Sequence, residues 1–165
     1  MACASPYGFG AAMAFPGRQV IALCGDGGLA MLLGDLLTAI QEEIAVKIVV
    51  FNNGTLGFVE LEMKVEGLVN AYTDLKNPDF ARLAEVIGFK GWRVETGDAL
   101  EDAVLQFLAH PGPALLDVKV NRTELVMPPK IEPAMAFGAL LYSAKAVLGG
   151  HAADVADLIE SNIRR

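Results

Sequence analysis

Residues 20–57 alternate between apolar and amphipathic character in a way that is typical of one strand–helix–strand unit. An apolar run over Val20–Cys24 ends in a glycine-rich turn, an amphipathic segment follows over Ala30–Glu43, and a second apolar run spans Val46–Phe51. The two apolar runs have the length of buried strands, and the segment between them has the spacing of a helix. Because parallel strands need such a crossover, we predict an α/β fold with a mostly parallel sheet.

Polar residues follow each of the two predicted strands. The sequence Gly-Asp-Gly-Gly occupies positions 25–28, and Asn-Asn-Gly occupies positions 52–54. Parallel strands end at the same edge of a sheet, so we expect Asp26 and Asn53 to lie close together. Carboxylate and carboxamide oxygens suit a hard ion such as Mg²⁺, and the N–H groups at the start of the following helix favour a phosphate. The sequence therefore predicts a Mg²⁺-bridged diphosphate at this edge.

The rest of the first 120 residues continues the alternation of helices and strands. The further elements predicted are a helix within 1–16, a loop over 65–76, a helix from Asn77 to Gly88, a strand over 91–94, a helix capped by Asp98 and a strand over 114–120. Asn77 suits the N-cap of its helix and Pro78 the first helical position. This order predicts helices on both faces of the sheet.

The composition changes after residue 121. The proline-containing segment Val126–Ile131 is expected to be extended and cannot join a central strand. Two helices are predicted beyond it, over Ala134–Leu148 and over residues 152–164. We expect a domain over residues 1–122 that carries the metal and phosphate site, and a C-terminal helical arm over residues 123–165.

Composition and charge exclude several classes of function. The net charge of −7 argues against a nucleic-acid partner. The hydrophobic fraction of 53% indicates either parallel strands that are buried on both faces or a surface that faces another chain, and we expect a homo-oligomer. Cys3 and Cys24 lack metal-ligand spacing, and Cys24 is expected to be a buried core residue. With no signal peptide and no apolar run of about 20 residues, we expect a cytoplasmic protein.

The spacing of the two polar turns resembles a known cofactor motif. Gly-Asp-Gly, 24 further residues and Asn-Asn resemble the thiamine diphosphate-binding motif. The wider sequence RQVIALCGDGG…VKIVVFNNGTLGFVELEMK…PPKI is similar to the C-terminal cofactor domain of the pyruvate oxidase and quinone-dependent pyruvate dehydrogenase family. The resemblance covers nearly the whole chain, and it implies the thiamine diphosphate-binding fold with thiamine diphosphate and Mg²⁺ as cofactors.

The resemblance also implies roles for individual residues. Asp26, Asn53 and the main-chain carbonyl of Thr55 would hold the metal. Phe58 would lie near the substrate, and Glu62 would line the reaction pocket, so these two are the catalytic candidates. The implied cofactor-binding set is Met1, Gly25, Asp26, Gly27, Gly28, Asn53, Thr55, Leu56, Gly57, Phe58 and Val59.

The activity that the resemblance implies is oxidative decarboxylation of pyruvate to acetate, with FAD as a further cofactor and quinone or oxygen as electron acceptor. FAD would be bound by another domain of the complete enzyme and not by this chain. A pyrimidine-binding domain, from a preceding part of the protein or from a partner chain, would supply the glutamate that activates the cofactor. We therefore expect a half-site that is a fragment of a longer protein and has little or no activity alone. The C-terminal arm is expected to clamp a neighbouring domain, and peripheral contact with the inner face of the cell membrane is the alternative.

Three other interpretations remain. The chain could be a separate cofactor-binding subunit of a thiamine diphosphate-dependent enzyme. It could belong to an acetolactate synthase-like 2-oxo-acid enzyme, although the Pro-Pro-Lys-Ile segment argues for the oxidase branch. It could also be a non-catalytic relic that keeps the fold without binding, which the intact pair of Asp26 and Asn53 argues against.

Overall fold

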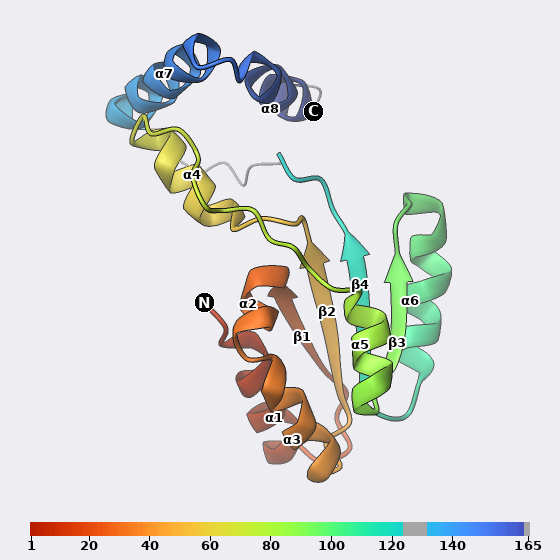
Figure 1. Cartoon of the computed structure of the whole chain (residues 1–165). Helices are drawn as coiled ribbons and strands as arrows, with labels where there is room; N and C mark the ends of the chain where they lie inside the picture. The colour runs from red at the N-terminus through yellow and green to blue at the C-terminus, as the bar shows by residue number, and fades with distance from the viewer. Residues whose placement is uncertain (124–131, 164–165) are drawn as a thin grey trace. The chain divides into compact units, whose positions relative to one another are not determined.

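The computed structural model describes residues 1–123 and 132–163, which form two compact units (Figure 1). The first unit contains residues 1–54 and 76–120, and the second contains residues 55–75 and those from 121 onward. This division runs differently from the predicted boundary at residue 122, because residues 55–75 group with the C-terminal helices.

A four-stranded sheet forms the centre of the first unit. Its strands are β1 (Val20–Gly25), β2 (Val46–Asn52), β3 (Lys90–Val94) and β4 (Ala114–Lys119), in the order β1-β2-β4-β3. All neighbouring strands are parallel, with Gly25 opposite Phe51 and Asn52 opposite Lys119. The predicted parallel sheet is confirmed, and this register brings the carboxyl ends of β1, β2 and β4 to one edge.

Helices cover both faces of this sheet, as predicted. One face packs against α1 (Ala4–Ala14), α2 (Asp26–Met31), α3 (Leu36–Gln41) and α5 (Phe80–Ile87), and the other against α6 (Leu100–Ala109). Alternate residues of one strand serve the two cores, because side chains along a strand point to opposite faces. In β4, Leu115 lies in the first core and Leu116 in the second.

The amphipathic helix predicted after the Gly-Asp-Gly-Gly turn is present, but its predicted continuity as a single helix to Glu43 is wrong. Helix α2 begins at Asp26, and a 3₁₀ turn over Leu33–Asp35 separates it from α3. Leu32 has φ −125° and ψ 33°, outside the helical region, and Gly34 follows within the turn. Glycine is a poor helix former, so a break costs little at this point.

Two predicted helix caps are also wrong. The N-cap of α5 is Asp79, whose Oδ1 accepts a hydrogen bond of 3.0 Å from the Arg82 N–H, so Asn77 lies outside the helix. Asp98 lies in a 3₁₀ turn over Gly97–Ala99, and α6 begins after it with no side-chain cap. The predicted end of α5 at Gly88 is confirmed, because this residue adopts φ +114°, which favours glycine.

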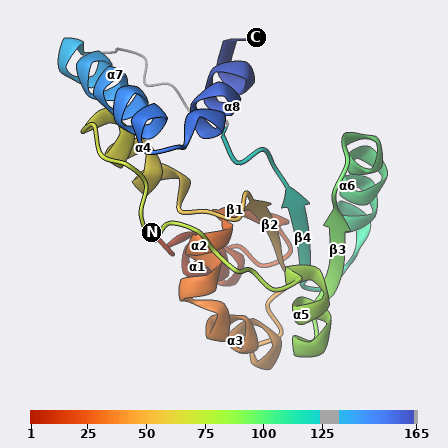
Figure 2. The same cartoon turned by 45° about the horizontal axis from the view of Figure 1, so that its top comes forward.

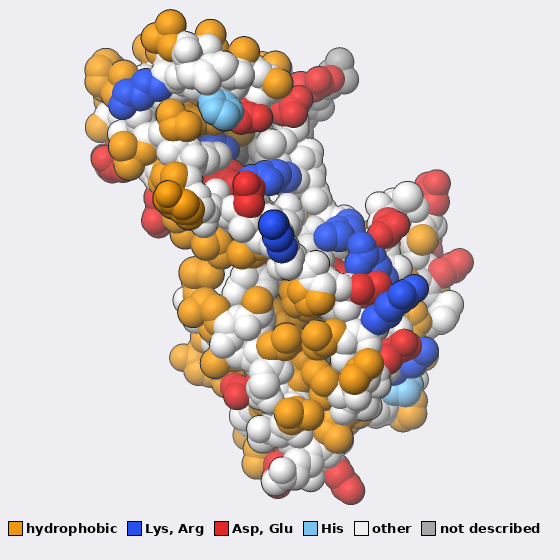
Figure 3. Space-filling view, in the orientation of Figure 1, with side chains coloured by type: hydrophobic (Ala, Val, Ile, Leu, Met, Phe, Trp, Pro, Cys, Tyr) orange, Lys and Arg blue, Asp and Glu red, His pale blue; other side chains and the backbone are white. Residues whose placement is uncertain are grey.

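The second unit is helical and contains α4 (Gly57–Val65), α7 (Pro133–Leu148) and α8 (Ala152–Ile163) (Figure 2). Helices α7 and α8 share a small core of Tyr142, Ala146 and Val155. The two predicted C-terminal helices are confirmed, whereas the predicted extended segment at 126–131 lies outside the described residues. Hydrophobic side chains lie on the surface of the α7–α8 pair, including Phe137, which is 68% exposed (Figure 3). None of the helices in the described ranges is both long and apolar enough to cross a membrane.

Candidate functional site

Asp26 lies at the junction of β1 and α2, at the carboxyl edge of the sheet, and is 2% exposed. Its Oδ1 accepts a hydrogen bond of 2.9 Å from the Gly27 N–H. Its Oδ2 accepts hydrogen bonds of 2.8 Å from the Gly54 N–H and 2.7 Å from Asn77 Nδ2. Three donors thus hold a buried carboxylate in one orientation.

The turn after β2 brings its backbone to Asp26. Gly54 has φ +72°, a left-handed backbone conformation that residues with a Cβ rarely adopt. Its N–H, which belongs to the peptide joining Asn53 to Gly54, reaches the Asp26 carboxylate. The predicted convergence of the two strand ends is confirmed, and Asn53 is half-buried beside this contact.

The first asparagine of the Asn-Asn pair has a different environment from the second. Asn52 is fully buried, and its Nδ2 donates a hydrogen bond of 2.8 Å to Asp117 Oδ1 on β4. Its Oδ1 accepts hydrogen bonds from Lys119 Nζ at 2.9 Å and Asn77 Nδ2 at 3.1 Å. Both ends of the Asn52 amide are therefore committed to protein contacts.

Asp26 forms no ion pair with a lysine or arginine within the described residues. A buried carboxylate without a compensating charge is costly, and a bound cation removes that cost. The described part of the chain contains no group of three or more His, Cys, Asp or Glu side chains that could hold a metal. A metal at Asp26 would therefore take its other ligands from amide oxygens, main-chain carbonyls, phosphates or water, a set that Mg²⁺ accepts.

Gly27 and Gly28 lie in the first turn of α2. The Gly27 N–H donates to Asp26 Oδ1, and phosphate binding at this helix start stays a prediction. A Cβ placed on Gly28 would come within 3.5 Å of the Ala2 nitrogen, so the chain near residue 2 lies close to this glycine. Met1 itself is 73% exposed.

Gly25 is the last residue of β1 in the first unit, and the predicted site residues from Thr55 onward belong to the second unit. Thr55 is buried, and its Oγ1 lies within hydrogen-bonding distance of two acceptors, a carboxylate oxygen of Glu60 and, at 3.1 Å, the Thr73 carbonyl. Phe58 is 73% exposed, and Glu62 is also exposed. The remaining predicted contacts, Leu56, Gly57 and Val59, are half-buried.

Glu60 is a buried carboxylate that the sequence did not single out. It is 4% exposed and has partners from several segments of its unit: Thr55, Lys64, Asn70, Thr73 and Arg122. Burial acts to raise the pKa of its carboxyl, but hydrogen bonds from Thr55 and Thr73 and the charges of Lys64 and Arg122 outweigh burial and hold the pKa below its ordinary value. The spacing of Glu60 and Lys64, four residues apart on one helix, was the available signal.

Cys24 is a buried side chain on β1, as predicted. Burial, reinforced by the nearby Asp26 carboxylate, raises the pKa of its thiol to about 12. The thiolate is the nucleophilic form, so these surroundings keep Cys24 unreactive.

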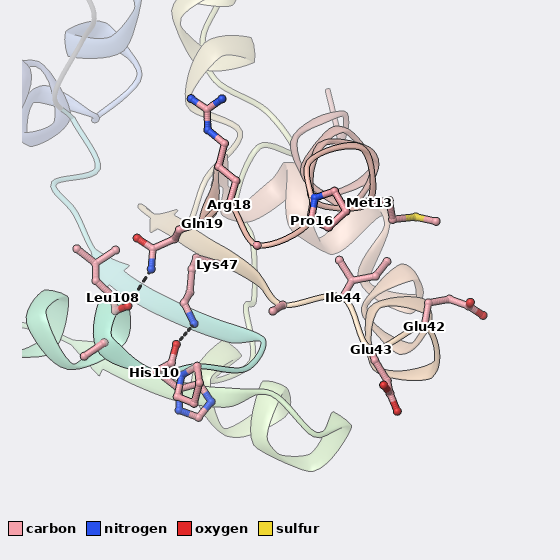
Figure 4. A pocket seen from close by; sticks show the side chains of 15 residues that line it. Met13, Pro16, Arg18, Gln19, Glu42, Glu43, Ile44, Lys47, Leu108 and His110 are labelled. Carbon is pink, nitrogen blue, oxygen red and sulfur yellow. Dashed lines mark hydrogen bonds between the residues drawn. The ribbon is translucent and has the colours of Figure 1, made fainter.

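A cavity of about 610 Å³ lies at the opposite, amino ends of the strands (Figure 4). Arg18, Gln19, Lys47 and His110 are among its lining residues. The Lys47 amine donates hydrogen bonds of 2.5 Å to the carbonyls of His110 and Gly112, and burial lowers its pKa. The amine is thus used in holding the loop before β4, at the other end of β2 from Asn52.

Known proteins resemble this chain in both sequence and structure. Residues 1–118 match the family model described as "Thiamine pyrophosphate enzyme, C-terminal TPP binding domain". The chain is 37% identical over 145 residues to the Bacillus subtilis protein named "Putative thiamine pyrophosphate-containing protein YdaP", covering 88% of this chain and 25% of that one. It is 36% identical over 124 residues to the mitochondrial acetolactate synthase catalytic subunit of Saccharomyces cerevisiae, covering 74% of this chain and 18% of that one.

A solved structure shares the fold. The thiamine diphosphate-dependent 4-hydroxybenzoylformate decarboxylase of Rhodococcus jostii RHA1 matches with a TM-score of 0.66 and 35% identity, over 72% of this chain and 23% of that one. The chain therefore spans about a quarter or less of the length of these relatives. The family match and the parallel sheet with Asp26 at its carboxyl edge agree. The chain therefore belongs to the thiamine pyrophosphate enzyme family, and its residues 1–118 form the C-terminal cofactor-binding domain of that family.

Proposed function

We propose that this chain binds thiamine diphosphate through Mg²⁺, with Asp26 as the anionic metal ligand. The observation that carries the proposal is the buried Asp26 carboxylate, which is held by three N–H donors and has no lysine or arginine partner among the described residues. The Asn53 side chain and the Thr55 main-chain carbonyl would complete the protein ligands, as the family resemblance implies. Further cofactor contacts are proposed at Met1, Gly25, Gly27, Gly28, Leu56, Gly57, Phe58 and Val59.

The contribution of this chain to the chemistry would be binding and orientation. When bound, thiamine diphosphate supplies an electron sink for decarboxylation of a 2-oxo acid. Asp26 would supply the charge that holds the metal, and the Gly54 N–H and Asn77 would keep that carboxylate in place. Phe58 and Glu62 remain the proposed catalytic residues, with Phe58 beside the substrate and the Glu62 carboxylate in the reaction pocket.

For the complete enzyme we propose oxidative decarboxylation of pyruvate, with FAD on another domain and quinone or oxygen as acceptor. The resemblance of the wider sequence, including Pro-Pro-Lys-Ile, is the support for this branch. An acetolactate synthase activity is the second candidate, since most of the other similar relatives carry that name. A pyrimidine-binding domain and a second copy of the chain are the proposed partners in either case.

Titration of the purified chain with thiamine diphosphate, with and without Mg²⁺, tests the proposal by calorimetry. We expect Mg²⁺-dependent binding of thiamine diphosphate. Asp26→Asn should weaken this binding by about 100-fold or more, because it removes the negative charge and replaces one of the two carboxylate oxygens that accept the three hydrogen bonds. Asp98→Asn, on an exposed turn of the same unit, is the matched control and should bind as the wild type does. A folded Asp26→Asn variant that binds with unchanged affinity would show that Asp26 is not the metal ligand.

A further inference from the structure

We infer that Asn77 is a positioning residue for the proposed metal site and leaves Asp26 Oδ1 as the oxygen that faces the ion. This inference rests on the proposed function, because it concerns how Asp26 is presented to Mg²⁺. It assigns Asn77 a role that neither its expected place as a helix cap nor the family match provides.

The contacts of Asn77 join the two polar strand ends. Its Nδ2 donates to Asp26 Oδ2 at 2.7 Å and to Asn52 Oδ1 at 3.1 Å, so the two hydrogens of one amide group serve both acceptors. The other donors to Asp26 are the backbone N–H groups of Gly27 and Gly54. Among the described residues, Asn77 is thus the side chain that hydrogen-bonds Asp26.

The distribution of donors makes the two oxygens of Asp26 unequal. Each carboxylate oxygen offers two lone pairs. Oδ2 accepts two hydrogen bonds, from Gly54 and Asn77, whereas Oδ1 accepts one, from Gly27. Oδ1 therefore retains a lone pair for a cation, and rotation of the carboxylate would break the contacts of Oδ2.

The chemistry of the amide suits this task. A lysine or arginine at position 77 would neutralise Asp26 and weaken its attraction for a metal, whereas an amide orients the carboxylate without cancelling its charge. Pro78 disfavours a helical backbone at the residue before it, which is consistent with α5 starting at Phe80 behind the Asp79 cap. Asn77 is thereby free of the helix and available to Asp26.

The test compares Asn77→Ala with Asp79→Ala in the full chain. Asp79→Ala removes the N-cap of the same helix and its ion pair with Arg93, without touching Asp26, so it reports the effect of loosening α5 and its contact with β3. The first readout is the affinity for thiamine diphosphate with Mg²⁺, by calorimetry. The second, in the cofactor-free chain, is hydrogen exchange of the Gly27 and Gly54 amides by NMR.

We expect Asn77→Ala to weaken Mg²⁺-dependent binding by about 10- to 100-fold, the range typical for residues that orient a metal ligand. The Gly27 and Gly54 amides should exchange faster in this variant, because the Asp26 carboxylate they bond is freer to rotate. Asp79→Ala should lower the melting temperature while leaving the affinity and both amides close to the wild type.

Each outcome decides between the two proposals. If the amides of Asn77→Ala exchange as in the wild type, Asn77 does not position Asp26, whatever the affinity. If the wild type fails to bind but Asn77→Ala accelerates both amides, the proposed function is overturned while the positioning of Asp26 stands. If Asp79→Ala reproduces the loss of affinity and the faster exchange, the effect comes from α5, and the inference is overturned.

Discussion

Two buried carboxylates of this chain are compensated in different ways. Asp26, in the first unit, is surrounded by uncharged N–H donors. Glu60, in the second unit, lies beside the cations Lys64 and Arg122, at 3.4 and 2.9 Å. A carboxylate paired with cations is satisfied within its own fold, whereas one held only by neutral donors keeps its attraction for an external cation. This contrast leads us to expect that Glu60 contributes to stability, and it supports the proposed metal-binding role of Asp26.

Glu60→Gln is expected to destabilise the second unit by about 2 kcal/mol at pH 7, since it removes a charged acceptor from a buried network. The pKa of Glu60 is lower in the folded chain than its ordinary value of 4.5, so the stabilisation is present above that value and disappears as the pH falls through the folded pKa. The difference in unfolding free energy between wild type and variant should therefore shrink as the pH is lowered below about 4.5. Denaturant unfolding of wild type and variant between pH 3 and pH 7 measures this difference in unfolding free energy.

Glu62→Gln is the matched control, because Glu62 lies on the same helix and is exposed. It should leave the unfolding free energy nearly unchanged at all of these pH values. A pH-independent loss in Glu60→Gln would contradict the role assigned to the ionised carboxylate.

At the scale of secondary-structure elements, close backbone approach fixes how α4 and α7 pack. A Cβ on Gly138 of α7 would lie 1.7 Å from the Val65 carbonyl oxygen of α4, which no side chain can accommodate. The absence of a Cβ at this position therefore allows the two helices to meet. Sequence periodicity predicted α7 but could not show this contact, which depends on a residue 73 positions earlier in the chain.

Gly138→Ala should force α4 and α7 apart and destabilise the second unit by about 3 kcal/mol, the upper range for overpacking. Gly10→Ala is the matched control, because Gly10 also lies in a helix but a Cβ there would meet nothing within 4 Å. Gly10→Ala should raise the free energy of unfolding by about 0.5–1 kcal/mol, because alanine has a higher helix propensity than glycine. Thermal unfolding of the two variants measures both effects, and equal changes would show that the α4–α7 contact does not require a glycine.

At the scale of the whole molecule, the chain spans 25% of YdaP and 23% of the decarboxylase that shares its fold. We expect no measurable turnover of pyruvate by the purified chain alone, because the proposed activating glutamate and flavin belong to other domains. Carbon dioxide release from pyruvate, with thiamine diphosphate and Mg²⁺ present, is the measurement. Steady turnover by the chain alone would contradict the proposed half-site.

Assays of quinone reduction and of acetolactate formation distinguish the two candidate activities once the pyrimidine-binding domain and the FAD-binding domain are both added. Reduction of a quinone that depends on pyruvate and FAD would support oxidative decarboxylation. Formation of acetolactate without consumption of a quinone would favour the synthase.

Much of the fold followed from local sequence pattern. The strands at Val20–Gly25 and Val46–Asn52 were predicted within a residue or two, because buried parallel strands appear as short apolar runs. The helix between them was predicted as one element, although the chain breaks at Leu32. Helix propensity is summed over many residues and is therefore insensitive to a break of a few residues.

The sequence by itself determined the parallel α/β fold and the placement of Asp26 and the Asn-Asn pair at the ends of adjacent strands, since strand direction and the order of elements settle both. Only the tertiary structure decided which neighbours complete the site. Asn77 reaches Asp26 across 51 positions of sequence, and Asn52 bonds Asp117 across 65. Such contacts depend on side chains from distant segments, and local periodicity carries no information about which of them will meet.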